Sequence, residues 1–152
     1  MKLMKHPYVN AAITASISLF YGVIFFVISG HLEFERMLQH APTLNHGFWN
    51  GWSAFIGRGC LKYIGCAYIL AALCVVVLSF IRRADYDEYQ AGILSVSFII
   101  TGILMVLLFP AALVLTLSAP NYAIETTLFL VVAHWSIFLA VNLAYTAKWC
   151  VT

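Results

Sequence analysis

Charged side chains are scarce in this chain. They make up 9% of its 152 residues, whereas hydrophobic residues make up 63%. A soluble globular domain carries about 25% charged and about 45–50% apolar residues. A water-soluble fold of this size could not cover its surface with so few charges. The shortage excludes an ordinary soluble domain and indicates an integral membrane protein that lipid surrounds.

The sequence also lacks a run of basic residues, and its formal net charge is only +2. Binding to nucleic acids depends on clustered lysine and arginine side chains that neutralise phosphates. We therefore expect no nucleic-acid partner. The partners that we expect are the lipid bilayer and either another membrane protein or further copies of the chain.

Several motifs of catalysis and cofactor binding are missing as well. The sequence has no G-x-S-x-G elbow, no glycine-rich phosphate loop and no pair of carboxylates inside an apolar segment. The four cysteines form no C-x-x-C pair, which disfavours a disulfide framework or a zinc knuckle. We interpret Cys60, Cys66 and Cys74 as small residues of one membrane helix, whereas Cys150 lies just past the last predicted span. The sequence thus predicts no catalytic residue, no cofactor and no metal site.

Long apolar segments are what this sequence has in abundance. A bilayer core about 30 Å thick requires roughly 20 residues of apolar helix. Four segments satisfy this requirement, at about residues 11–30, 60–81, 91–117 and 124–147. The first exceeds the apolar core of about 7–15 residues that a cleaved signal peptide has. We predict an all-α integral membrane protein with one domain, residues 1–152, and four transmembrane helices in an antiparallel bundle.

Lysine and arginine in short loops indicate the orientation, because they favour the cytoplasmic side. Five of them fall on one side of the predicted membrane and three on the other. The five are Lys2, Lys5, Arg82, Arg83 and Lys148; the three are Arg36, Arg58 and Lys62. This excess predicts that both termini are cytoplasmic. The absence of any N-x-[ST] site and the compact loops favour a bacterial inner membrane.

The third predicted span has a marked beginning and an internal proline. Asp85, Asp87 and Glu88 precede it, and carboxylates are favourable at the positive end of a helix dipole. We interpret these residues as a helix start signal. Pro110 lacks a backbone donor, so we expect a kink near that position. A kink or a tilt would absorb the excess length of this span.

The fourth predicted span has two different faces. Small residues recur on one face at helical spacing: Ala133, Ser136, Ala140, Ala144 and Ala147. A polar strip lies roughly opposite, formed by Thr127, His134 and Tyr145 with Asn142 at its flank. Both small and polar residues mark helix contacts in a bilayer. We expect one face to pack within the monomer and the other to point toward a central cavity or a second subunit.

The other three spans also offer small residues for helix packing. They are Ala11, Ala15, Ser18 and Gly22 in the first span, Ala67 and Ala71 in the second, and Ala91 and Ser95 in the third. Each span therefore has a surface that another helix can approach closely. This distribution favours the four-helix bundle.

His134 is the only ionisable residue near the middle of a predicted span, where such residues are costly and often functional. A haem ligand, a proton relay and a pore-lining residue are the functional alternatives. A bis-histidine haem site would need a second membrane-embedded histidine, and a relay would need a nearby acidic partner. We interpret His134 as a neutral imidazole that bonds a serine, threonine or tyrosine of a neighbouring span. An oligomer that brings two copies of His134 together stays open.

The loop after the first span is rich in histidine and glutamate: His31, His40 and His46, with Glu33 and Glu35. Zinc accepts such ligands in four-coordinate sites. However, the spacing does not match an H-E-x-x-H pattern. The sequence therefore gives no specific metal site in this loop.

An aromatic cluster follows in the same loop, in the stretch LNHGFWNGWSAF. Phe48, Trp49, Trp52 and Phe55 fall mainly on one side of a short amphipathic helix, and Asn45 can cap its start. Tryptophan gathers where lipid headgroups meet hydrocarbon, because its ring is apolar and its N–H is polar. We predict an interfacial collar in preference to the lid of an active site.

These observations leave three hypotheses about function. The first is a non-enzymatic accessory protein that binds a membrane partner, because packing surfaces are plentiful and catalytic groups are scarce. The alternative is a small homo-oligomeric transporter or channel lined by Thr127, His134 and Tyr145. The second alternative is a redox subunit that binds haem or a metal through histidines.

Overall fold

The computed structural model describes residues 5–30, 47–82, 84–118 and 120–150. Within that part of the chain the structure is helical and contains no strand, as the sequence predicts. Four helices are long and apolar enough to cross a membrane. The elements are α1 (Pro7–Ser29), α3 (Gly47–Gly57), α4 (Leu61–Ile81), α5 (Glu88–Ser118), the 3-10 turn η2 (Pro120–Tyr122) and α6 (Ala123–Cys150).

The predicted spans agree closely with the four long helices, and local chemistry explains where two of them begin. Helix α1 begins at Pro7 because proline is pre-organised for the first helical position and has no N–H to leave unpaired. Helix α5 begins at Glu88 because Asp87 caps it. The Asp87 carboxylate accepts a bond of 2.7 Å from the Gln90 N–H, and the Gln90 side chain accepts one of 3.2 Å from the Asp87 N–H.

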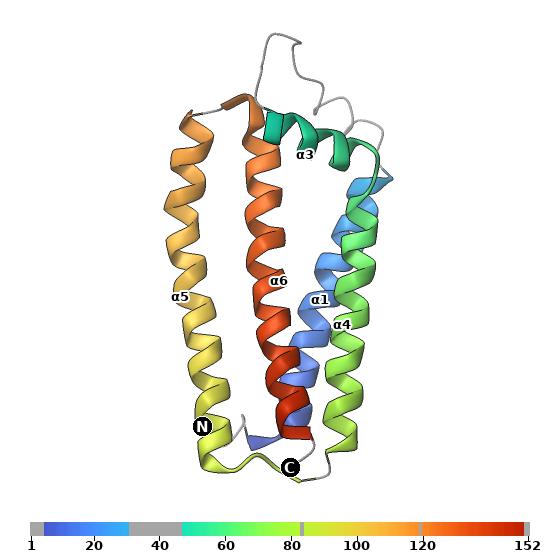
Figure 1. The fold of residues 1–152 in the computed structure, drawn as a ribbon, viewed down its shortest axis with the longest axis vertical. Coiled ribbons are helices and arrows are strands. Elements are labelled where there is room, and N and C mark those ends of the chain that lie inside the picture. Colours follow the sequence, from blue (N-terminus) through green and yellow to red (C-terminus); the bar gives the residue numbers. More distant parts are fainter. Residues whose placement is uncertain (1–4, 31–46, 83, 119, 151–152) are drawn as a thin grey trace.

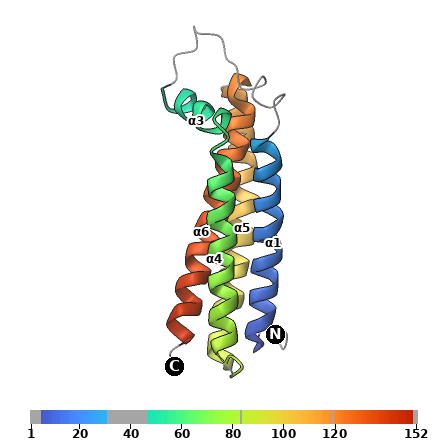
Figure 2. The ribbon, with the colours of Figure 1, turned by 90° about the vertical axis from the view of Figure 1, so that its right-hand side faces the viewer.

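The long helices run in alternating directions, and both described ends of the chain lie at one end of the molecule (Figure 1). We call this end the N/C end and the other, which α3 crosses, the α3 end. Helices α1 and α4 pack together along their lengths, whereas α6 contacts α4 and α5. Figures 1 and 2 show that α5 stands at the far side of α6 from α4. Helix α6 is therefore the central element.

The contact between α1 and α4 depends on two glycines. A Cβ atom added at Gly65 would lie 3.2 Å from the Gly22 carbonyl oxygen and 3.3 Å from its Cα atom. The two backbones are thus almost in contact, and the predicted small face of α1 is buried at Ala11, Ser18 and Gly22. The prediction for the second span is wrong at Ala67, which is exposed. The closest approach occurs at Gly65, which turns Ala67 to the outside.

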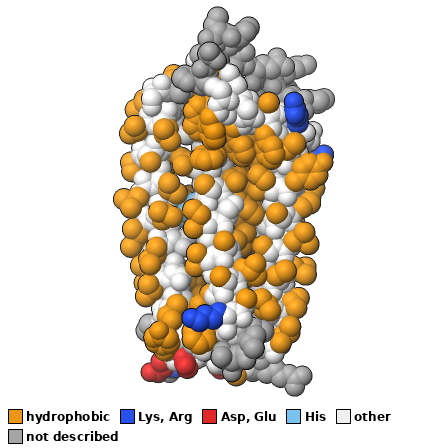
Figure 3. Space-filling view, viewed as in Figure 1, with side chains coloured by type: hydrophobic (Ala, Val, Ile, Leu, Met, Phe, Trp, Pro, Cys, Tyr) orange, Lys and Arg blue, Asp and Glu red, His pale blue; other side chains and the backbone are white. Residues whose placement is uncertain are grey.

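Charged side chains avoid the middle of the long helices. In the described ranges every Lys, Arg, Asp and Glu lies in a terminal turn or a loop. On the face seen in Figure 3, hydrophobic side chains cover the middle of the molecule, and the charged side chains gather near its two ends. Helix α5 continues through Pro110 to Ser118 without interruption.

We predict that Gly65→Val destabilises the protein, because the added methyl groups would meet the Gly22 backbone. Overpacking of this kind costs about 1–3 kcal/mol of unfolding free energy. The measurement is denaturation of the purified protein in mixed micelles. Gly102→Val is the matched control, since a Cβ atom at Gly102 meets nothing within 4 Å. Equal loss of stability in both variants would contradict the α1–α4 contact.

Candidate functional site

The most polar part of the interior joins α6 to α1. The side chains of Asn10 and Asn142 exchange two hydrogen bonds, of 2.9 and 3.0 Å. Asn142 also donates to the Thr14 hydroxyl at 2.9 Å, and Thr146 donates to the Asn142 carbonyl oxygen at 2.8 Å. All four residues are buried. We call them the asparagine cluster; its side chains satisfy one another, which is what burial away from water requires.

Helix α6 makes a second polar contact with α5 through His134. The His134 Nε2 atom lies 3.1 Å from the Thr101 carbonyl oxygen, which can only accept, so Nε2 carries the proton. The Thr101 hydroxyl is occupied by the Ser97 carbonyl oxygen at 2.8 Å. The imidazole thus bonds a neighbouring long helix, as expected, but through the backbone of a threonine instead of its hydroxyl.

Tyr145 belongs to a tightly packed group at the N/C end. Its hydroxyl donates to the Gln90 carbonyl oxygen at 2.8 Å, and its ring meets the Tyr86 ring edge-on at 5.6 Å. The Arg82 guanidinium lies 4.7 Å from the Tyr86 ring centroid and donates to the Gln90 side chain at 2.7 Å. Arg82 also donates to the Trp149 carbonyl oxygen, in the last turn of α6. These bonds fasten the α4–α5 loop to the end of α6.

The start of α1 is attached to the same loop. The Tyr86 N–H donates to the Lys5 carbonyl oxygen at 2.8 Å. Two exposed contacts accompany this bond: an ion pair of Lys5 with Glu88 at 3.1 Å and a hydrogen bond between His6 Nδ1 and the Asp85 carboxylate at 2.9 Å. Exposed pairs contribute about 0–1 kcal/mol. The backbone bond and the buried Tyr86 side chain therefore matter more for this attachment.

The predicted polar strip does not form one site. Thr127, His134 and Tyr145 all face α5, but the exposed Thr127 hydroxyl bonds the Ala123 carbonyl oxygen of its own helix at 2.8 Å. Asn142 turns instead toward α1. Their polar atoms end on separate acceptors, so the strip connects helices and does not line a shared cavity.

The opposite face of α6 points outward. Ala140, Ala144 and Ala147 are exposed, and we call these three residues the small-residue face. The other two predicted members are not free, because Ala133 is half-buried and the Ser136 hydroxyl lies 3.0 Å from the Tyr68 hydroxyl of α4. Of the two faces that the sequence distinguishes, the polar one packs within the chain. The reason is that its larger side chains reach acceptors on α1 and α5, whereas alanines have none to offer.

Two contacts of α6 were not predicted from the sequence. The Tyr68 hydroxyl of α4 donates to the Val132 carbonyl oxygen at 2.8 Å and lies 3.0 Å from the Ser136 hydroxyl. The Trp135 N–H donates to the Ser18 hydroxyl of α1 at 3.1 Å. The sequence shows only that each of these side chains carries a polar atom on an otherwise apolar helix. It does not show which residue that atom bonds.

The aromatic residues of α3 pack onto the beginning of α6. The Trp52 N–H donates to the Glu125 carbonyl oxygen at 3.0 Å, and Trp49 stacks on Tyr122 with centroids 6.3 Å apart. The rings of Phe48 and Trp52 meet Phe129 edge-on, at 5.4 and 5.8 Å. The predicted short helix is present, and its tryptophans cover the end of α6. The sequence did not identify Tyr122 and Phe129 as the surface beneath it.

The histidines and glutamates of the preceding loop lie outside the described residues, and so does Asn45. They are His31, Glu33, Glu35, His40 and His46. Among the residues that the structure does describe, no group of three His, Cys, Asp or Glu side chains could hold a metal ion.

Comparisons with protein-family models, curated proteins and solved structures found no match to this chain. The class of protein therefore follows from its own features. The chain is an α-helical protein whose four long apolar helices are typical of multi-pass membrane proteins.

We predict that Asn10 and Asn142 are energetically coupled. Asn10→Leu or Asn142→Leu alone leaves a buried amide without its partner, at a cost of about 1–3 kcal/mol. The double variant removes both amides and should lose less than the sum, with a coupling of about 0.6–1.7 kcal/mol. Unfolding in mixed micelles measures the cycle. Thr127→Val is the control and should be nearly neutral, because that hydroxyl bonds its own helix. Losses of stability that simply add in the double variant would contradict the pairing of Asn10 with Asn142.

Proposed function

We propose that this chain is a multi-pass protein of the cell membrane, with α1, α4, α5 and α6 crossing the bilayer as one antiparallel bundle. The exposed apolar side chains along these helices and the placement of charges at both ends support this location. Lys5, Arg82 and Lys148 lie at the N/C end, and Arg58 and Lys62 lie at the α3 end. The described residues thus give three to two at the N/C end, and the count of five to three from the whole sequence has the same sign, which favours a cytoplasmic N/C end.

Single cysteines in a background without the native ones test this orientation. Gly51→Cys in α3 and Ala84→Cys in the α4–α5 loop are both exposed positions. We expect a membrane-impermeant maleimide to label the first in intact cells and the second only after permeabilisation. The reverse pattern would invert the topology. Release of the protein by alkaline carbonate would refute membrane insertion.

We further propose that the protein is a non-enzymatic accessory protein, which binds another membrane protein or a second copy of itself through the small-residue face of α6. The supporting observation is the contrast between the two faces of this helix. The polar face is occupied by bonds within the chain, whereas the small-residue face is exposed. In hydrocarbon, small residues at intervals of three and four allow a second helix to approach its backbone.

The other hypotheses receive less support from the geometry. A pore lined by Thr127, His134 and Tyr145 would need these side chains to face an aqueous path, but they face α5. A redox subunit would need ligands that converge on a metal or haem. His134 is the only histidine that the described helices hold in their interior, and its Nε2 atom is engaged with Thr101.

Ala140→Leu tests the proposed docking face, because a leucine there would hold a second helix away from α6. We expect a loss of about tenfold in apparent affinity for the partner, which corresponds to about 1.4 kcal/mol. Crosslinking in native membranes followed by quantitative pull-down measures it for both a foreign partner and a second copy. Ala111→Leu on the exposed side of α5 is the matched control. Undiminished capture with Ala140→Leu would refute the proposal.

A further inference from the structure

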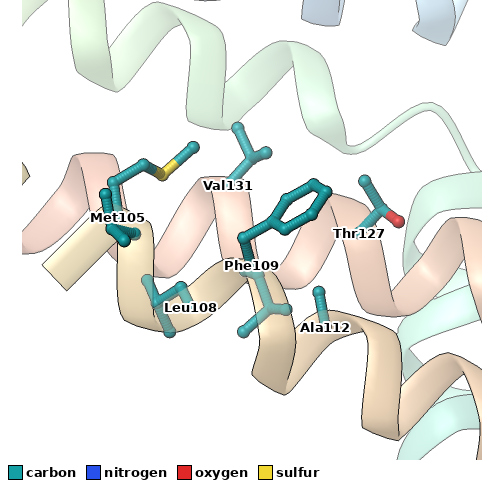
Figure 4. Close-up of a pocket in the computed structure, with 8 residues that line it drawn as sticks. Met105, Leu108, Phe109, Ala112, Thr127 and Val131 are labelled. Carbon is teal, nitrogen blue, oxygen red and sulfur yellow. The ribbon is translucent and has the colours of Figure 1, made fainter.

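A cavity of about 320 Å³ lies between α5 and α6, in the half of the molecule nearer to α3. Figure 4 shows side chains of both helices around this space, with Phe109 from α5 and with Thr127 and Val131 from α6. The lining is completed by Met105, Val106, Leu108, Ala112 and Leu130. The cavity is large enough for a small-molecule site, which typically measures about 300–1,000 Å³.

The lining determines what chemistry the cavity can accept. It contains no charged residue, and its only polar side chain is Thr127. The Thr127 hydroxyl donates its hydrogen to the Ala123 carbonyl oxygen at 2.8 Å, so this donor needs no acceptor from a guest in the cavity. Water requires two to four polar partners, and ions or headgroups require more. Only an uncharged, apolar guest complements such a surface.

The space is closed at one end and continues into a second hollow at the other. Toward the N/C end it is closed by the bond between His134 and Thr101, one turn away from Val131 and Met105. Beyond Leu94 no residue of α5 is fully buried, so α6 covers the side chains of α5 only in part here. Toward the α3 end a second hollow of about 310 Å³ shares Thr127 and continues along Ile124 to Ala123.

The two hollows together follow α6 from Val131 to Ala123, eight residues or about 12 Å of helix axis. The space is therefore elongated along the helices instead of round. An elongated guest without polar groups, entering from the exposed side of two apolar helices, has the shape and chemistry of a hydrocarbon chain. The space is open on one side, where the lining residues Val106 and Phe109 are largely exposed, so such a chain can enter it from the surrounding bilayer.

We infer that this cavity binds one acyl chain of a bilayer lipid, with the headgroup toward the α3 end. The inference rests on the membrane location proposed above, but not on the docking role of the small-residue face. The bound chain would fill the space between α5 and α6 and thereby complete their contact in the half of the molecule where α5 has no buried residue.

The test uses the full chain in phosphatidylcholine nanodiscs that contain a phosphatidylcholine with a diazirine in one acyl chain. Crosslinked residues are mapped by mass spectrometry. We expect Val131, a half-buried lining residue, to be labelled more strongly than Ile103, which is exposed on α5 outside the cavity. Native mass spectrometry after stepwise delipidation should show one retained lipid per chain.

Two phenylalanine variants make the test specific. Ala112→Phe fills the cavity, whereas Ala111→Phe places the same ring one residue away, on the exposed side of α5. We expect Ala112→Phe to reduce labelling of Val131 and retention of the lipid about tenfold, the factor that 1.4 kcal/mol gives. Ala111→Phe should leave both unchanged. Labelling of Ile103 should be equal in all variants.

Three results would overturn the inference. The first is labelling of Val131 no stronger than that of Ile103, because ordinary surrounding lipid then explains it. The second is an equal response to both phenylalanine variants. The third is a loss of partner capture in Ala112→Phe without any loss of bound lipid, which would assign the cavity to a protein side chain. Failure of the Ala140→Leu experiment alone would leave the lipid site intact, since Ala140 does not line the cavity.

Discussion

Hydrogen bonds from α6 to its neighbours set the arrangement of the long helices. Asn142 bonds α1, Ser136 meets a tyrosine of α4, and His134 bonds the backbone of α5. In a bilayer each such bond contributes only about 0.6 kcal/mol on average. Their effect is therefore mainly on direction, since they fix which side of α6 each helix covers. Helices α1 and α4 also contact each other directly, without α6 between them. The close approach of Gly22 and Gly65 makes that contact dense.

This arrangement gives the two faces of α6 different roles. The polar face connects the protein internally, and the small-residue face is exposed at Ala140 and Ala144. A helix bundle that satisfied its polar groups less completely would have them available for catalysis or conduction. In the described helices His134, Asn142 and Tyr145 are engaged within the chain, although the buried hydroxyls of Ser29 and Thr126 are not. The engagement of these three residues is why binding a partner is the function we favour over transport or redox chemistry.

The two ends of the molecule are held together by different kinds of contact. At the N/C end, Arg82, Gln90 and Tyr145 join α4, α5 and α6 by polar bonds. At the α3 end the contacts are aromatic, through Trp49 and Trp52. Helix α5 follows this division: its buried residues, Gln90, Ala91 and Leu94, lie in the first two turns, and farther on it lines an apolar cavity with α6. The lipid site that we infer lies where polar bonds between these two helices are missing.

The sequence by itself determined the number of long helices and their limits, because length and continuous apolarity need no knowledge of neighbours. It also indicated the start of α5 through the acidic residues Asp85, Asp87 and Glu88, and the structure adds that Asp87 caps the helix at Gln90. Only the tertiary structure decided which face of each helix is covered. Apolar residues surround these helices on all sides, so no periodic pattern separates inside from outside. The partners Asn10 and Asn142 are 132 residues apart, and local sequence cannot encode their meeting.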